Sequence, residues 1–246
     1  MSQIAGAAAA ALASLQADDI DFLRLLPKAE LHAHLNGSIP IDTVLELAQE
    51  YSSSITHSPS DEQTIENNIV AETFKLLKSG IFSDGLSAVF SLFPAIHVLT
   101  STPQALQTGT RAVLHSFLEA DGMKSPQCTY LELRTTPRET PYMTRADYLR
   151  TVLIEIERYP ATQAALIVSV DRRMSNSDIE ECVDLAIMLK NSGRRVVGID
   201  LCGDPLKGGD MQIFTKHILR AKEAGLGLTV HIAEVRGLFI GCGHTD

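Results

Sequence analysis

Short apolar segments recur along the chain and alternate with longer amphipathic ones. Five of these segments are rich in apolar and β-branched residues, a composition typical of strands covered on both faces. They predict a largely buried sheet. The predicted strands are Ala29–Leu35, Thr129–Arg134, Ala165–Val170, Val196–Leu201 and Leu226–Ile232.

Segments with helical spacing lie between these strands. Thr144 and Ser177 precede two of them and are suitable N-cap residues, and Gly225 follows the last one as a C-terminal cap should. The polar stretch Ser52–Asn68 is expected to be a surface loop. The predicted helices are Ile41–Tyr51, Ala71–Leu77, Pro103–Ala120, Arg145–Arg158, Asp178–Asn191 and Met211–Ala224.

The repeated order of strand and helix predicts a parallel sheet with right-handed crossovers. A doubly wound open sheet and a closed (β/α)8 barrel both fit this order. The positions of the reactive side chains distinguish them. A barrel gathers its active site from the C-terminal ends of several strands, whereas a doubly wound sheet binds its ligands mainly in one crevice.

Composition indicates a globular protein and excludes several other classes. The chain has 246 residues, of which 45% are hydrophobic and 21% charged, enough for one large domain or two small ones. A net charge of −9 without a Lys/Arg-rich run argues against a nucleic-acid-binding protein. No apolar run reaches the ~18 residues that span a membrane. We therefore expect neither nucleic acid nor a membrane as a partner.

The N-terminus and the cysteines bear on localisation. Residues 1–20 are rich in alanine and lack the basic region of a signal peptide, so we expect a flexible tail or a short helix outside the core. The cysteines Cys128, Cys182, Cys202 and Cys242 are scattered without a CxxC pair, which indicates a reduced, cytoplasmic protein.

Two histidines close the first predicted strand. His32 and His34 are two residues apart, so on a strand their side chains point to the same face. Zinc binds imidazole nitrogens at about 2.0–2.1 Å, and such a pair is suited to it. An isolated His-x-His is often two unrelated polar residues, but two imidazoles at the end of an apolar strand favour a metal site.

A second polar group closes the fifth predicted strand. His231 offers a third imidazole, and Glu234 follows in the next turn. A carboxylate beside a zinc-bound water acts as a general acid or base, so Glu234 is the candidate catalytic residue. Taken alone, a satisfied histidine and a solvated glutamate would give the same pattern.

A glycine-containing turn closes the fourth predicted strand. Gly203 lies between this strand and Asp204-Pro205, where it permits either close approach of the backbone to a ligand or a tight turn. All three groups of residues follow strand ends, so they are expected to meet at one mouth. This favours the (β/α)8 barrel over the doubly wound sheet.

These motifs resemble the adenosine/AMP deaminase family, and they occur in the same order. The similarity extends from about Leu26 to Val235, and several ordered motifs are more specific than any one of them. Within the family, the chain is most similar to the adenosine deaminase-like branch, the N6-methyl-AMP deaminases. The motifs are Pro27–Ser38, Ala95–Ser101, Tyr130–Arg138, Val170–Arg173, Val197–Pro205 and His231–Glu234.

The resemblance implies a zinc-dependent hydrolase barrel with one Zn²⁺ per chain. His32, His34 and His231 would be the ligands, and Glu234 would donate a proton to the purine ring. The implied reaction is hydrolytic deamination of a 6-amino or 6-alkylamino purine nucleotide, N6-methyl-AMP to IMP and methylamine, with adenosine deamination as the alternative. The implied substrate contacts are His34, Asn36, His97, Thr135, Thr136, Pro137, Arg138, Asp171 and Gly203.

Three of these contacts bear on a phosphate group. Asn36 stands where adenosine deaminases carry Asp, and a carboxylate there would repel a 5′-phosphate by ~1–4 kcal/mol. Neutral Asn36 therefore favours a nucleoside monophosphate. Arg138 and His97 are natural phosphate partners, because charge-assisted hydrogen bonds to phosphate are strong.

Five strands are fewer than the eight of a complete barrel. Residues 21–235 are therefore expected to be the N-terminal part of a deaminase barrel, and residues 236–246 a divergent tail. The family has a histidine on its sixth strand and an Asp pair on its eighth, which nothing after Val235 supplies. We expect little activity from this polypeptide alone and a monomer at full length.

Two further hypotheses stay open. One is a barrel hydrolase with two metals that acts on an ester, a lactone or an amide. The other is an inactive form that only binds a nucleotide or a partner.

Overall fold

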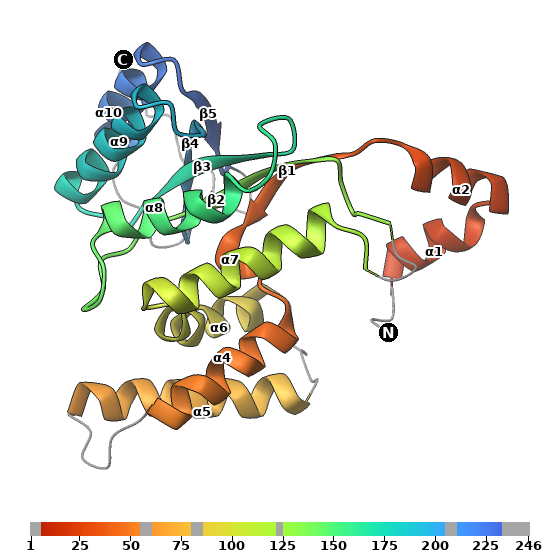
Figure 1. Ribbon diagram of the computed structural model, residues 1–246, viewed down its shortest axis with the longest axis horizontal. Coiled ribbons are helices and arrows are strands. Elements are labelled where there is room, and N and C mark those ends of the chain that lie inside the picture. Colours follow the sequence, from red (N-terminus) through yellow and green to blue (C-terminus); the bar gives the residue numbers. More distant parts are fainter. Residues whose placement is uncertain (1–5, 55–60, 80–85, 122–124, 205–210, 233–246) are drawn as a thin grey trace, which may run out of the picture.

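The core of the described residues is a sheet of five parallel strands. The computed structural model describes residues 6–54, 61–79, 86–121, 125–204 and 211–232. Within them the strands lie side by side in chain order, which leaves the first and last at the two edges (Figure 1). The strands are β1 (Ala29–His34), β2 (Tyr130–Thr135), β3 (Ala164–Asp171), β4 (Val196–Cys202) and β5 (Gly227–Val230).

Four helices alternate with the strands along the chain and pack against the sheet. α7 packs on β2 and on α8, α8 packs on β3, and α9 lies between β3 and β4, while α10 contacts β4 and β5. Covered in this way, β3 is buried along almost its whole length. The expectation of a partial (β/α)8 barrel with five strands is confirmed. The helices are α7 (Pro103–Leu118), α8 (Arg145–Ile156), α9 (Asn176–Asn191) and α10 (Met211–Glu223).

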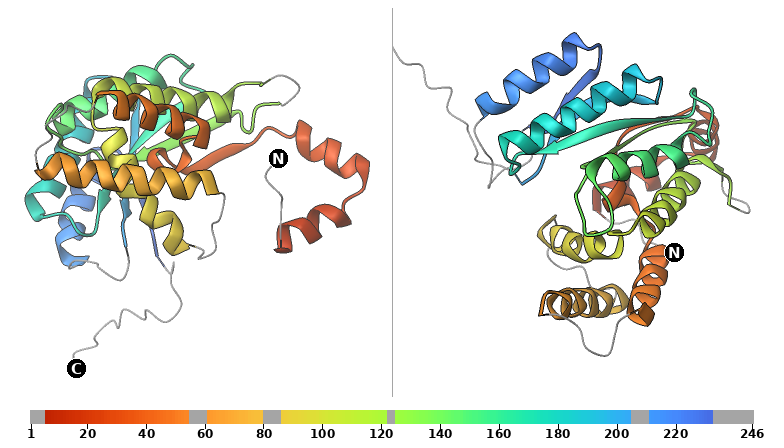
Figure 2. Two further views of the ribbon diagram at one scale, coloured as in Figure 1. Left: turned by 90° about the horizontal axis from the view of Figure 1, so that it is seen from below. Right: turned by 60° about the vertical axis from the view of Figure 1, so that its left-hand side comes forward.

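A second group of helices packs together beyond the end of β1 (Figures 1 and 2). The prediction of a surface loop at Ser52–Asn68 is wrong where the structure describes it. Residues 52–54 end one helix and residues 61–68 begin another, because exposed polar residues are compatible with a helix that buries one side. The helices are α3 (Leu35–Ser38), α4 (Ile41–Ser54), α5 (Asp61–Ser79) and α6 (Leu86–Leu99).

The helix caps agree with two of three predictions. Thr144 caps α8 by accepting a hydrogen bond from the backbone N–H of Asp147 at 3.1 Å. Gly225 follows α10 with a φ of +77°, as a C-terminal cap requires. The prediction of Ser177 as an N-cap is wrong. The cap of α9 is Ser175, which accepts from the N–H of Asp178, so the helix begins before Ser177.

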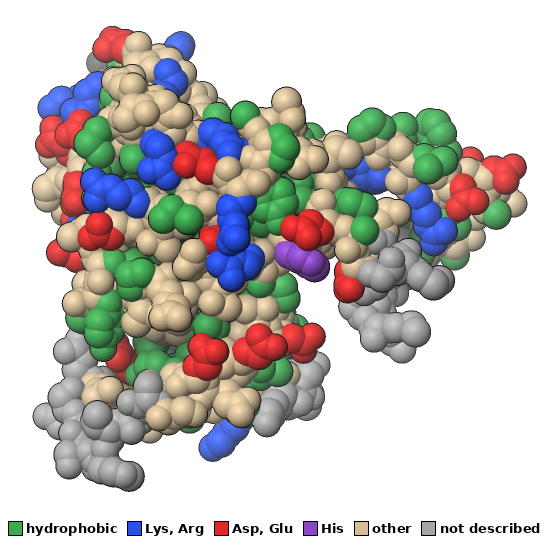
Figure 3. Space-filling model, viewed as in Figure 1, with side chains coloured by type: hydrophobic (Ala, Val, Ile, Leu, Met, Phe, Trp, Pro, Cys, Tyr) green, Lys and Arg blue, Asp and Glu red, His purple; other side chains and the backbone are tan. Residues whose placement is uncertain are grey.

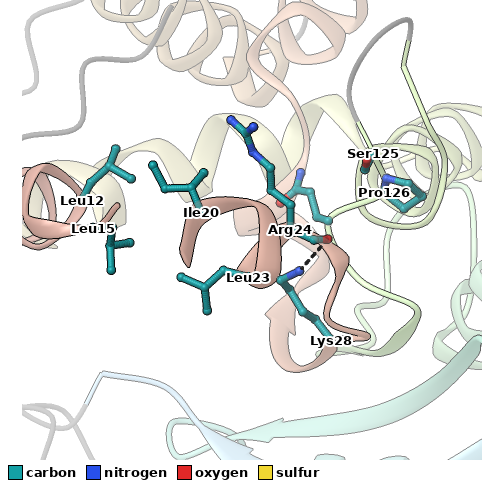
Figure 4. Close-up of a pocket in the computed structure, with 9 residues that line it drawn as sticks. Leu12, Leu15, Ile20, Leu23, Arg24, Lys28, Ser125 and Pro126 are labelled. Atoms are coloured by element: carbon teal, nitrogen blue, oxygen red, sulfur yellow. Dashed lines mark hydrogen bonds between the residues drawn. The ribbon is translucent and has the colours of Figure 1, made fainter. Parts of the chain in front are cut away.

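Two short helices precede β1 and project away from the rest of the chain (Figures 1 and 2). They are α1 (Gly6–Ser14) and α2 (Ala17–Leu25), and α2 has no buried residue. Figure 4 shows leucine and isoleucine side chains of both helices around a hollow of about 730 Å³. On the face drawn in Figure 3, acidic and basic side chains are interspersed. None of the described helices is both long and apolar enough to cross a membrane.

A buried carboxylate ties α7 to α8. Glu155 of α8 is 1% exposed and accepts hydrogen bonds from Gln107 at 2.6 Å and Arg111 at 2.9 Å, both of α7, and from Arg158 at 3.0 Å. Burial alone would raise the pKa of Glu155, but these hydrogen bonds outweigh it and lower the pKa to about 2.

Glu155→Gln is expected to lower the free energy of unfolding at pH 7 by about 1–2 kcal/mol, because it removes the charge that the two arginines contact. The loss is no larger because both arginines are half exposed and solvent screens their charge. The folded-state pKa lies below the ordinary value of 4.5, so the stabilisation is present above that pH and is lost as the pH falls towards 2. Urea unfolding at pH 7 and pH 3 measures both effects. A difference between wild type and variant that is as large at pH 3 as at pH 7 would contradict this account.

Candidate metal centre

Three histidines from the two edges of the sheet meet at one point. His32 and His34 come from β1, and His231 follows β5. The Nε2 atoms of His32 and His231 are 2.8 Å apart, and those of His34 and His231 are 3.0 Å apart. Two nitrogens on one tetrahedral zinc lie about 3.3 Å apart, so the three donor atoms need to move only slightly to share an ion.

Hydrogen bonds at Nδ1 orient the imidazole of His231. Nδ1 lies 3.1 Å from Oδ1 of Asp200 and 3.0 Å from the carbonyl oxygen of Leu201. With Nδ1 donating to these acceptors, Nε2 is left unprotonated and faces the other two imidazoles. Metal-binding histidines are typically oriented in this way by a carboxylate or a carbonyl. Arg172 adds a hydrogen bond from its guanidinium to the carbonyl oxygen of His231.

Asp200 is fully buried, and both of its carboxylate oxygens accept hydrogen bonds. Its Oδ1 also accepts from Thr229 at 2.7 Å and from Arg134 at 3.0 Å, and its Oδ2 accepts from Ser169 at 3.1 Å. Burial would raise the pKa of Asp200, but the hydrogen bonds from His231 and Thr229 and the charge of Arg134 outweigh it and lower the pKa. The carboxylate therefore stays ionised beside His231.

Burial and neighbouring charges keep the β1 imidazoles neutral. Burial, followed by the nearby His231, lowers the pKa of His34 to about 4. Burial and the charge of Arg134 also lower the pKa of His32. Neutral imidazole is the form that binds a metal, so the donor set is ready for a cation at neutral pH.

Asn36 lies directly after this centre, on α3. Its side-chain Oδ1 is buried and has no hydrogen-bond partner among the described residues. It lines a hollow of about 250 Å³ whose other walls, including Phe93 and Ile96 of α6, are apolar. A buried acceptor at the edge of an apolar hollow is suited to a ligand that carries both an apolar ring and polar groups.

His97, Arg138 and Asp171 form a second polar group. The Arg138 guanidinium donates to the carbonyl oxygen of His97 at 3.0 Å and to Oγ1 of Thr100 at 2.8 Å. Burial and the charges of Arg138 and Arg173 lower the pKa of His97 to about 4, while Asp171 acts in the opposite direction. His97 is therefore a neutral imidazole near pH 7, not the cation that a charge-assisted phosphate contact would need.

The residues from Thr135 to Pro137 lie at and directly after the end of β2. Thr135 faces the helices, where its hydroxyl lies 2.8 Å from that of Tyr148. The hydroxyl of Thr136 lies 3.5 Å from the sulfur of Cys202, and Pro137 is buried. Because side chains alternate along a strand, Thr135 and the neighbouring Arg134 point to opposite faces. Glu234 lies outside the described residues.

Both the backbone conformation at position 203 and the nearby side chain of Asp171 require glycine there. Its φ is +101°, and a Cβ at this position would lie 2.5 Å from Oδ1 of Asp171. That carboxylate is fixed by Arg173, whose Nε donates to the same oxygen at 2.8 Å. The glycine allows β3 and β4 to end close together at the mouth of the sheet.

Comparison with known proteins shows the family. The model of the family described as adenosine deaminase matches residues 27–240. The chain belongs to the adenosine deaminase family. The resemblance found in the sequence is confirmed.

Individual members of the family align with most of the chain. The adenosine deaminase-like protein of Caenorhabditis elegans is 33% identical, covering 89% of this chain and 51% of the relative. The N6-methyl-AMP deaminase of Bos taurus is 34% identical, and the match covers 87% of this chain and 57% of the relative. The crystal structure of arabidopsis ADAL complexed with IMP is 31% identical with a TM-score of 0.69, covering 87% and 60%. The chain thus spans between about half and three fifths of these family members.

Sequence reasoning missed the residues that support the histidines. Arg134 and Asp200 lie inside segments whose apolar pattern predicts buried strands, and that pattern gives neither residue a role. The signal was present, since a charged residue in a strand covered on both faces must find a partner of opposite charge.

Gly203→Ala is expected to destabilise the fold more than the matched change Gly193→Ala. Gly193 also has a positive φ, of +81°, but a Cβ there would meet no atom within 4 Å. Both variants are strained by about 1–2 kcal/mol, and Gly203→Ala should lose at least about 1 kcal/mol more because Asp171 must move. Chemical unfolding of both variants measures the difference. Equal losses would show that contact with Asp171 does not constrain this position.

Proposed function

We propose that the chain is the N-terminal part of a zinc-dependent deaminase that acts on 6-substituted purine nucleotides. The proposed reaction converts N6-methyl-AMP and water to IMP and methylamine. The convergence of three imidazole nitrogens at the strand ends, in a member of the adenosine deaminase family, carries this proposal.

The donor set supports zinc as the metal. Three imidazoles with no cysteine suit a catalytic zinc site, which keeps a position open for water or substrate. When bound, zinc makes a water molecule nucleophilic near neutral pH. His32, His34 and His231 would hold the ion, one per chain. Glu234, three residues after His231, is the proposed proton donor to the purine ring.

The neighbouring side chains support a nucleotide as the substrate. A relative is named N6-methyl-AMP deaminase, and a similar structure was solved with IMP. We assign the polar edge of the purine and the sugar to His34, Asn36 and Gly203. The 5′-phosphate is assigned to the group around His97 and Arg138, with Asp171 nearby. Neutral His97 can still donate an N–H there, and Arg138 supplies the positive charge.

Arg138 is suited to a binding role because its position is already fixed. Two of its nitrogens donate to the C-terminal end of α6, and its guanidinium lies 5.5 Å from the centre of the Tyr148 ring. Its Nε is buried without a hydrogen-bond partner among the described residues. A cation that is immobilised before the ligand arrives loses less conformational entropy on binding. Thr135 to Pro137 would then act through the backbone that positions Arg138.

His231→Ala is expected to abolish binding of stoichiometric zinc, because two imidazoles alone leave the ion without its third protein ligand. The matched control is His115→Ala, which removes a half-exposed histidine from α7. Elemental analysis of dialysed protein should give about one zinc per chain for wild type and control. Full zinc content in the His231 variant would contradict the proposed ligand set.

Asn36→Asp is expected to weaken binding of IMP by about tenfold or more, because a carboxylate would repel the 5′-phosphate. Binding of inosine, which lacks the phosphate, should change much less. Asn191→Asp makes the same chemical change on the exposed end of α9 and should leave both affinities unaltered. Calorimetric titration compares the ligands. Equal losses for IMP and inosine would contradict the phosphate argument.

A further inference from the structure

Arg134 of β2 is a buried cation to which the proposed reaction assigns no part. Its side chain is 5% exposed. Removing a guanidinium from water costs several kcal/mol unless hydrogen bonds and an opposite charge compensate for it. Nε of Arg134 is buried without a hydrogen-bond partner among the described residues, but Nη1 and Nη2 reach three other strands. They contact the carbonyl oxygen of Leu31 in β1, Oδ1 of Asp200 in β4 at 3.0 Å and Oγ1 of Thr229 in β5 at 3.3 Å.

The contact with Leu31 falls on an irregularity in the sheet. Glu30 pairs with Leu131 and Ala33 with Leu133, so Leu31 and His32 together oppose a single residue of β2. Such a bulge frees backbone groups from the ladder and redirects a side chain. Arg134 donates to one freed group, the carbonyl oxygen of Leu31, while the backbone N–H of His32 donates to Glu30 at 2.7 Å.

The contact with Asp200 falls behind the third histidine. The same Oδ1 that accepts from Arg134 also faces Nδ1 of His231, and Thr229 donates to it as well. This oxygen and the carbonyl oxygen of Leu201 are the two acceptors that orient the ring of His231. Without the arginine, a buried carboxylate would lose its counter-charge and would be free to turn towards its remaining donors.

We infer that Arg134 is a positioning residue for the metal centre. One guanidinium fixes both the bulge that carries His32 and the carboxylate that orients His231. It thereby sets the spacing between ligands that come from opposite edges of the sheet. In the described residues β1 and β5 do not pair with each other, so the arginine is a direct link between them. This inference rests on the proposed zinc site.

The test compares zinc affinity in Arg134→Gln, Arg134→Lys and Glu155→Gln. The last variant is the matched control, because Glu155 is also a buried charged residue with ion-pair partners but lies on α8, away from the histidines. Competition with a chelator should give an affinity about 10- to 100-fold weaker for Arg134→Gln, the range typical of residues that support metal ligands. Arg134→Lys keeps the charge but loses the planar guanidinium, so its zinc affinity should lie between those of wild type and Arg134→Gln.

The control removes a purely structural explanation. Glu155→Gln should be destabilised in urea yet bind zinc within about twofold of wild type, since a loss at α8 leaves the ligands in place. Wild-type affinity in both arginine variants would overturn the inference, and so would an equal loss of affinity in Glu155→Gln. If Arg134→Gln does not fold, Arg134→Lys against Glu155→Gln decides by the same criteria.

A measurement without metal separates this inference from the proposed function. The ¹⁵N shifts of the His231 ring report which nitrogen carries the proton. Wild type should show one tautomer, protonated at Nδ1, and the arginine variants should show a mixture. If wild-type protein binds no zinc, the proposed function fails. An unchanged tautomer in the variants removes the positioning role whether or not zinc binds.

Discussion

The contact between Arg134 and Asp200 inside the sheet is the interaction on which the candidate site depends. Both residues are buried, and each would be costly to bury without the other. A buried ion pair of this kind contributes little net stability compared with a well-packed apolar pair. Its value here is geometric, because the arginine of the pair also contacts β1 and β5, and the pair fixes the carboxylate behind His231.

The parallel sheet explains why residues far apart in sequence meet. Each helix returns the chain to the same end of the sheet, so the C-terminal ends of the strands lie at one mouth. His34 and Asp171 are the last residues of β1 and β3, and Gly203 and His231 follow β4 and β5 directly. The curvature of the sheet brings β1 and β5 close enough for their imidazoles to touch. The chemistry therefore depends on curvature and on strand order together.

The sheet and the imidazole cluster were predictable from the sequence, but the layers around them were less so. All five strands were placed within about two residues, because continuous apolar runs give a strong signal. α6 was not predicted, since it is apolar on most sides and includes Pro94. The direction of Thr135 could have been read from the alternation along β2. The hydrogen bond from Arg134 to the Leu31 carbonyl oxygen depends on a bulge in β1, and no local sequence pattern predicts that bulge.

The central claim is that three imidazoles share one zinc ion, and X-ray absorption at the zinc edge of the metal-loaded chain tests it most directly. The account predicts a first shell of nitrogen or oxygen at about 2.0–2.1 Å with the outer-shell scattering of about three imidazole rings. A shell of sulfur at about 2.3 Å, or a spectrum that lacks imidazole scattering, would contradict it.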